Sequence, residues 1–211
     1  MTNVLILGAS GQIARYAIDL FLSETDAQLT LYLRNSNRLR KYESDRVRII
    51  EGDVLNIATL KEAMAGQDVV YANLAGDLEE QAKTIVEGMD TTGVKRLIFI
   101  SSLGIYDEVP GEFGKWNNQT IGRYLGPYRK SVDMIEASDL DYTVLRPAWL
   151  TDHDEIDYEI TQKDEPFKGT EVSRKSVASL VVKLVESPDF QVRRNLGVNK
   201  PNTDGDKPAF Y

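Results

Sequence analysis

The chain has 211 residues, of which 42% are hydrophobic and 27% are charged, and its formal net charge is −8 at pH 7. This length and balance fit one globular domain spanning residues 1–211, while the negative charge disfavours nucleic acid and anionic membranes as partners. The sequence contains no cysteine, which excludes disulfides and thiolate catalysis.

We expect neither a membrane anchor, a leader segment nor a metal site. No apolar run approaches the ~20 residues that cross a bilayer. Residues 1–3 lead into an apolar strand without a basic segment, so a cytoplasmic protein is expected. The one histidine, His153, lies in an acidic loop, where a lone histidine is more often solvated surface than a metal ligand.

Short apolar runs alternate with helical patterns along the chain, which is typical of βαβ units. We expect an irregular stretch over 103–118 and a less regular insertion over about 149–172, with a candidate strand at 158–160. The regular elements predicted in chain order are a strand at 4–7, a helix from about 12, strands at 29–33 and 47–50, a helix ending at 64, a strand at 69–72, a helix at 79–89, a strand at 97–100, a helix at 123–138, a strand at 142–145, and a helix capped by Ser173.

This order predicts a Rossmann-type α/β fold, a doubly wound parallel sheet with helices on both faces. Right-handed crossovers favour the strand order 3-2-1-4-5-6, with one extra candidate strand near 196–198. Ligands of such sheets bind beyond the carboxyl ends of the strands, at the switch between strands one and four. Each motif below lies at such an end.

A glycine turn joins the first predicted strand to the first helix. Gly8 permits a tight turn, Gly11 lets backbone N–H groups approach a pyrophosphate, and Ala14 lets the helix pack near the strand. The spacing G-x-x-G-x-x-A therefore predicts dinucleotide binding, although such a turn is sometimes only structural. The residues expected at the pyrophosphate are Gly8, Ser10, Gly11, Gln12 and Ile13.

The end of the second strand indicates which dinucleotide is bound. NAD sites commonly place a carboxylate there for the ribose 2′-hydroxyl, whereas this sequence has Arg34 and Asn35. Guanidinium groups bind a 2′-phosphate, so NADP(H) is the predicted cofactor, with Arg15 and Arg38 nearby and NAD(H) as the alternative. The other interpretation is that these arginines only keep the surface soluble.

Two further strand ends complete the predicted cofactor site. Asp53 is placed to accept from the adenine amino group, with Val54 beside the ring, although Asp53 alternatively caps the next helix. Asn73 and Ala75 follow the fourth strand, where small residues let the cofactor lie on the backbone.

Together these motifs resemble the short-chain dehydrogenase/reductase superfamily, and in particular its atypical NmrA-like branch. The resemblance covers nearly the whole chain and implies a nicotinamide-dependent fold, without by itself implying turnover. The segments that carry it are Gly8–Ala14, Leu33–Asn35, Gly52–Val54, Ser101–Gly104, Leu140–Pro147 and Val172–Ala178.

The catalytic part of the family pattern is incomplete here. The superfamily uses Ser, Tyr and Lys, with the last two spaced Y-x-x-x-K on one helix face, where the lysine lowers the pKa of the tyrosine. The spacing places Tyr124 at the tyrosine position and Tyr128 at the lysine position, while Lys130 lies on another face. Because Pro127 fits best in a first helical turn, the helix is expected to begin near it, with Tyr124 on the preceding loop.

The remaining predicted site residues follow the fifth and sixth strands. Ser102 is the preferred catalytic serine and Ser101 a cofactor contact, although both hydroxyls suit backbone hydrogen bonding equally well. Tyr106 is a further candidate proton donor. The resemblance implies that Pro147 lies near the nicotinamide. Trp149 either forms a wall of a substrate pocket or simply packs in the core.

Three functions are compatible with these residues. The first is an NADPH-dependent reductase of a small carbonyl or quinone-type acceptor, in which the cofactor carries the hydride chemistry. The second is a non-catalytic NADP(H)-binding redox sensor, which the broken Tyr/Lys pair favours. Epimerase or dehydratase activity ranks last because the chain is short for a large substrate domain. The sequence specifies neither the substrate nor whether the protein is a monomer or a homodimer.

Overall fold

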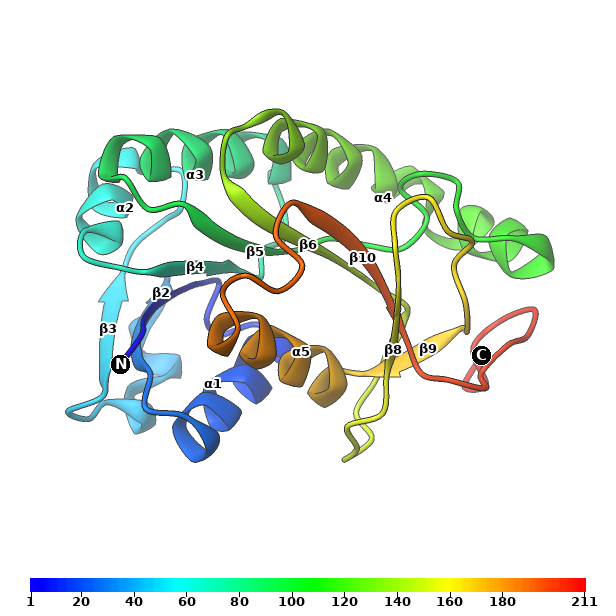
Figure 1. Ribbon diagram of the computed structural model, residues 1–211, viewed down its shortest axis with the longest axis horizontal. Helices are drawn as coiled ribbons and strands as arrows, with labels where there is room; N and C mark the ends of the chain where they lie inside the picture. Colours follow the sequence, from blue (N-terminus) through cyan, green and yellow to red (C-terminus); the bar gives the residue numbers. More distant parts are fainter.

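The computed structural model describes residues 1–211, and its centre is an eight-stranded sheet between two layers of helices (Figure 1). The order β3-β2-β1-β4-β5-β6-β10-β8 confirms the predicted 3-2-1-4-5-6 arrangement. It also confirms the extra strand expected near 196–198, which is β10, and β8 follows it at the same edge. All neighbours pair in parallel except β8, which is antiparallel to β10. The strands are β1 (Asn3–Leu7), β2 (Gln28–Leu33), β3 (Val47–Glu51), β4 (Val69–Ala72), β5 (Arg96–Ile100), β6 (Asp141–Pro147), β8 (Glu159–Thr161) and β10 (Arg194–Asn199).

Helices cover both faces of the sheet, which explains why its central strands are almost purely apolar. On one face, α1 (Gln12–Glu24) packs against α5 (Arg174–Glu186). The opposite face carries α2 (Ile57–Met64), α3 (Leu78–Thr92) and α4 (Gly111–Ala137). Two separate apolar cores result, one on each side of the sheet. No helix is both long and apolar enough to span a bilayer.

The beginning of α4 corrects the prediction for residues 103–138. The helix begins at Gly111, so most of the stretch expected to be irregular is helical, and Pro127 lies inside the helix instead of in its first turn. A proline there removes the N–H that would bond the carbonyl of Arg123, but both residues are exposed to water. Gly126 has no Cβ to clash with the proline ring, and buried residues on both sides of Pro127, including Phe113 and Val132, hold the helix to the sheet.

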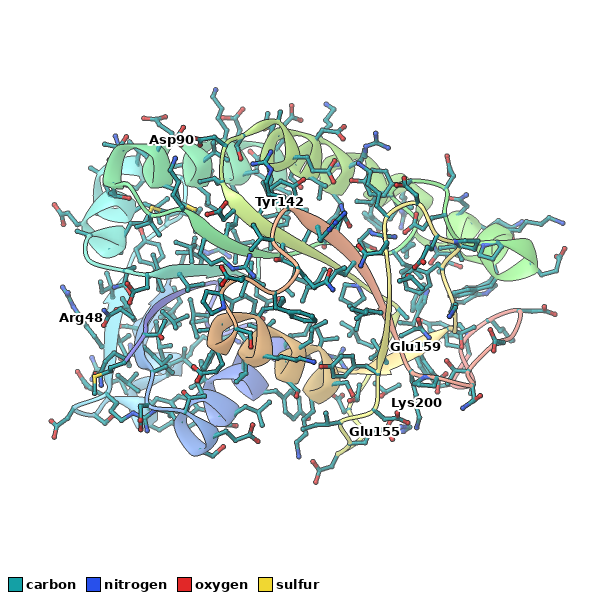
Figure 2. All side chains as sticks on the ribbon, viewed as in Figure 1. Arg48, Asp90, Tyr142, Glu155, Glu159 and Lys200 are labelled. Atoms are coloured by element: carbon teal, nitrogen blue, oxygen red, sulfur yellow. The ribbon has the colours of Figure 1, made fainter.

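The insertion at 149–172 contains more regular structure than predicted. β7 (Trp149–Thr151) pairs in parallel with β9 (Glu171–Ser173), and the candidate strand at 158–160 is observed as β8. Figure 2 shows Glu155, Glu159 and Lys200 on the same side of the molecule, near β8 and the end of β10. Lys200 Nζ lies 2.7 Å from Glu155 Oε2 and therefore ties the insertion to the end of β10.

Ser173 caps α5, as predicted. Its Oγ accepts a hydrogen bond from the backbone N–H of Ser176 at 3.0 Å and donates one to the carbonyl oxygen of Glu155 at 2.8 Å. The side chain is buried, so neither bond is readily replaced by water. This one residue therefore fixes both the start of α5 and the path of the insertion.

We expect Ser173→Ala to lower the free energy of unfolding by about 1–2 kcal/mol, because both bonds are lost. Denaturant unfolding monitored by circular dichroism measures this change. Ser23→Ala is the matched control, because the exposed Ser23 hydroxyl bonds only within its own helix. Its expected effect is within about 0.5 kcal/mol. Equal effects of the two variants would contradict the assignment of Ser173 as a cap.

Candidate functional site

Two adjoining cavities lie at the carboxyl ends of the central strands. The larger, of about 470 Å³, extends from the end of β1 to the ends of β2, β3 and β4. The smaller, of about 280 Å³, lies beside β5, β6 and α4. Asn73 and Leu74 at the end of β4 line both cavities, so the two meet at the switch point between β1 and β4.

The glycine turn forms the floor of the larger cavity. Gly8 has φ +71°, and a Cβ atom on it would lie 2.1 Å from the carbonyl oxygen of Asn73. A Cβ on Gly11 would lie 2.1 Å from Asn73 Nδ2. The first turn of α1 has no side-chain cap and no acidic residue, so its free N–H groups and positive dipole end suit a bound anion.

The arginine end of this cavity is set by β2 and β3. Arg34 follows β2, lines the cavity and is exposed to water. Glu51 ends β3 and accepts from the Ser36 backbone N–H at 2.9 Å and from the Ser36 hydroxyl at 2.6 Å. These hydrogen bonds lower the pKa of Glu51 and fix the loop after β2. The charge that faces the cavity from this loop is therefore the guanidinium of Arg34.

Tyr32 also lines the larger cavity, although no sequence motif pointed to it. Its hydroxyl lies 2.9 Å from the carbonyl oxygen of Asp53 and 3.0 Å from Thr59 Oγ1. The Asp53 carboxylate lines the cavity and accepts from the N–H of Leu55 at 2.9 Å. The cap of α2 is Asn56, so Asp53 does not have the capping role considered for it.

The smaller cavity is mainly apolar but contains hydroxyl groups. Ser101 Oγ is buried and has no hydrogen-bond partner, whereas Ser102 Oγ donates to the carbonyl oxygen of Leu103 at 3.1 Å. Tyr128 lines the same cavity, and burial raises the pKa of its phenol. No lysine, arginine or histidine lines this cavity, so no cation lowers the pKa of that phenol.

The structure brings most of the predicted residues to the two cavities. Gln12 and Asn35 line neither cavity, and the Tyr106 hydroxyl bonds Glu136 and Asn195 instead. Among the predicted cofactor residues, those that line the larger cavity are Gly8, Ser10, Gly11, Arg34, Asp53, Val54, Asn73 and Ala75. The predicted residues that line the smaller one are Ile13, Ser101, Ser102, Pro147 and Trp149, together with Asn73.

The position of Tyr124 differs from the expectation of a catalytic tyrosine. Tyr124 lies within α4 and not on a preceding loop, is 52% exposed, and lines neither cavity. Its ring packs against the guanidinium of Arg123, 4.6 Å from the ring centroid. Tyr128, one helical turn later, is the tyrosine that reaches the cavity. The spacing in the sequence assigned the tyrosine position to Tyr124, whereas the lining of the smaller cavity contains Tyr128.

Comparison with known proteins gives a family and several solved structures. The family described as NAD(P)H-binding matches residues 8–188. A Rossmann-fold NAD(P)-binding family protein from Shigella flexneri is 50% identical, with all of both chains covered and a TM-score of 0.86. A short-chain dehydrogenase/reductase from Veillonella parvula, solved in complex with NADP, is 30% identical over 99% of each chain, with a TM-score of 0.94.

More distant structures share the fold. ChuY from Escherichia coli O157:H7, an anaerobillin reductase, is 20% identical over 97% of this chain and 100% of its own, with a TM-score of 0.81. Among curated proteins, none matches this sequence. The predicted resemblance to short-chain dehydrogenase/reductases is thereby confirmed, while the NmrA-like branch stays a prediction.

We expect Gly8→Ala to lower the free energy of unfolding by about 3 kcal/mol or more, because its Cβ would overlap the Asn73 carbonyl. Gly66→Ala is the matched control. Gly66 also has positive φ, at +77°, but nothing lies within 4 Å of its would-be Cβ. Only the backbone strain of about 1 kcal/mol is expected there. Similar losses on thermal or denaturant unfolding would contradict the close approach at Gly8.

Proposed function

This chain belongs to the NAD(P)H-binding family of Rossmann-fold proteins, and from that premise we propose that it is an NADPH-dependent reductase of a quinone-type or small carbonyl acceptor. The observation that carries the proposal is the meeting of two unlike cavities at Asn73 and Leu74. The larger suits a dinucleotide, because it combines a glycine turn, an uncapped helix N-terminus and a cation. The smaller suits an apolar acceptor.

The charge at the end of β2 supports NADPH over NADH. Arg34 lines the larger cavity where an NAD site commonly has a carboxylate. A guanidinium pairs with a 2′-phosphate through charge-assisted hydrogen bonds, whereas NADH offers it only a hydroxyl. The Veillonella parvula relative was solved in complex with NADP. These points support NADP(H) as the preferred cofactor of this chain.

The chemistry of the smaller cavity favours the quinone-type acceptor. NADPH supplies the hydride when it is bound. An isolated carbonyl then becomes a localised alkoxide and needs a good proton donor, whereas a conjugated acceptor spreads the new negative charge. Tyr128 is a weak acid without a neighbouring cation, so it is a poor proton donor to a localised alkoxide. The hydroxyl of Ser102, the serine favoured by the sequence, donates to Leu103. The proposal therefore assigns to Ser101, whose hydroxyl has no partner, the hydrogen bond to the acceptor oxygen.

One observation favours the second candidate, a non-catalytic sensor of the NADP(H) redox state. The smaller cavity has no cation to activate Tyr128, so the usual proton relay of the superfamily is incomplete. A sensor of this kind binds NADPH and NADP⁺ with clearly different affinities and shows no turnover with any acceptor. A reductase oxidises NADPH in the presence of quinones at a rate that depends on residues of the smaller cavity.

We expect Arg34→Ala to raise the Kd for NADPH about ten-fold and to leave the Kd for NADH within about two-fold, because only NADPH loses an ionic hydrogen bond. Titration followed by tryptophan fluorescence measures both constants. Arg48→Ala serves as the charge-matched control, because Arg48 lies on β3 outside the cavity lining (Figure 2). A loss of NADH affinity equal to the loss of NADPH affinity would contradict a 2′-phosphate site.

For turnover, we expect NADPH oxidation with quinones to exceed that with simple ketones, and Ser101→Ala to lower kcat about ten-fold or more, since a hydrogen bond to the developing oxyanion is lost. Tyr124→Phe, outside both cavities, should leave kcat unchanged. Burial raises the pKa of Tyr128 above its ordinary value of 10.0, so the phenol stays protonated at any pH below about 10. Ionisation of Tyr128 should therefore not lower kcat/KM in that range. Redox-dependent cofactor affinity without turnover would instead support the sensor.

A further inference from the structure

The segment between β5 and α4 has no regular secondary structure, yet one carboxylate holds it in place. Glu108 Oε1 accepts a hydrogen bond from the backbone N–H of Gly104 at 2.9 Å, and Oε2 accepts one from the N–H of Tyr106 at 2.9 Å. The Glu108 side chain is 5% exposed. A buried carboxylate that bonds two N–H groups of its own loop defines the shape of that loop.

The position of Glu108 is in turn set by a buried ion pair. Its Oε1 contacts the guanidinium of Arg146, which projects from β6 and is 0% exposed. Arg146 Nε also donates to Asn195 Oδ1 on β10 at 2.7 Å. The backbone carbonyl of Glu108 accepts from the N–H of Phe167, in the insertion, at 2.9 Å. Glu108 therefore joins the segment to β6 through its carboxylate and to the insertion through its backbone carbonyl.

The same segment forms part of the smaller cavity. Ser101, Ser102 and Leu103 line that cavity and immediately precede Gly104. Gly104 lies so close to α4 that a Cβ on it would be 2.7 Å from Asn117 Nδ2. Asn117 is itself buried, and its Oδ1 accepts from Trp149 Nε1 at 3.0 Å. The contacts run from Glu108 through Gly104 and Asn117 to the indole that walls the cavity.

We propose that Glu108 is a positioning residue for the acceptor: by holding the N–H groups of Gly104 and Tyr106, it sets Ser101–Leu103 and, through Asn117, the indole of Trp149. The effect on the acceptor rests on the proposed function. The effect on the position of Trp149 does not depend on it. None of these residues lines the larger cavity. Loss of Glu108 should therefore weaken acceptor binding and leave cofactor binding unchanged.

A second carboxylate in the same neighbourhood provides a matched control. Glu136 on α4 accepts from the Tyr106 hydroxyl at 3.1 Å, from Asn195 Nδ2 at 3.1 Å and from Lys163 Nζ at 2.6 Å. Its side chain is 18% exposed. Glu136 bonds no backbone N–H of the segment. Removing the charge of Glu136 shows how the loss of a carboxylate charge in this region affects the smaller cavity while the hydrogen bond to Gly104 stays in place.

The experiment compares Glu108→Gln with Glu136→Gln in a Trp116→Phe chain, where Trp149 is the one remaining tryptophan. Three quantities are measured: the KM for a quinone acceptor, the Kd for NADPH, and the constant for acrylamide quenching of Trp149. For Glu108→Gln we expect the KM to rise about ten-fold, the quenching constant to rise about two-fold, and the Kd for NADPH to stay within about two-fold. Glu136→Gln should leave all three within about two-fold.

The proposal is overturned if Glu108→Gln leaves the KM and the quenching constant unchanged, or if Glu136→Gln changes both equally. If the parent chain turns over no acceptor, the proposed function fails, and the quenching comparison alone supports or overturns the positioning of Trp149. Glu108→Gln leaves Arg146 buried without its counter-charge, which is costly. Should that variant not fold, Glu108→Leu/Arg146→Met removes both charges and the two N–H acceptors, and the same outcomes decide.

Discussion

The fold brings the turn after β1 so close to the end of β4 that neither Gly8 nor Gly11 has room for a side chain. This close approach places the uncapped start of α1 at the switch point of the sheet, directly after Gly11, which lines the larger cavity. It also puts Asn73 between the two cavities. The two cavities are therefore held side by side by the close packing of the glycine turn against Asn73.

Much of the sheet could be predicted from the sequence because its strands are buried on both faces. A parallel strand of this kind, such as β5, is a short run of apolar residues, and the helices between the strands have their own periodicity. The right-handed crossover rule then limits the possible orders. The larger cavity could also be predicted, because its residues belong to short local motifs at strand ends, such as the glycine turn and Arg34.

The beginning of α4 and the place of Tyr128 in the smaller cavity could not be predicted in this way. Gly126 and Pro127 are local signals that end a helix, but packing of the segment against the sheet outweighs them. A stripe of mostly apolar residues with helical spacing runs across Pro127, and it was the signal available in the sequence: Phe113, Asn117, Ile121, Leu125, Tyr128, Val132 and Ile135. Tyr128 and Trp149 come to line one cavity only in the folded chain, because they belong to α4 and to β7.

The two ends of the site are built from different parts of the chain. The larger cavity uses residues from Gly8 to Gln81, whereas Tyr128, Pro147, Trp149 and Leu150 of the smaller one come from the second half. The insertion that begins with Trp149 lies at the edge of the sheet farthest from β3 (Figure 1). A change of length or side chain in this insertion therefore alters the smaller cavity without touching the lining of the larger one. The wall formed by Trp149 and Leu150 is thus physically separate from the glycine turn and Arg34.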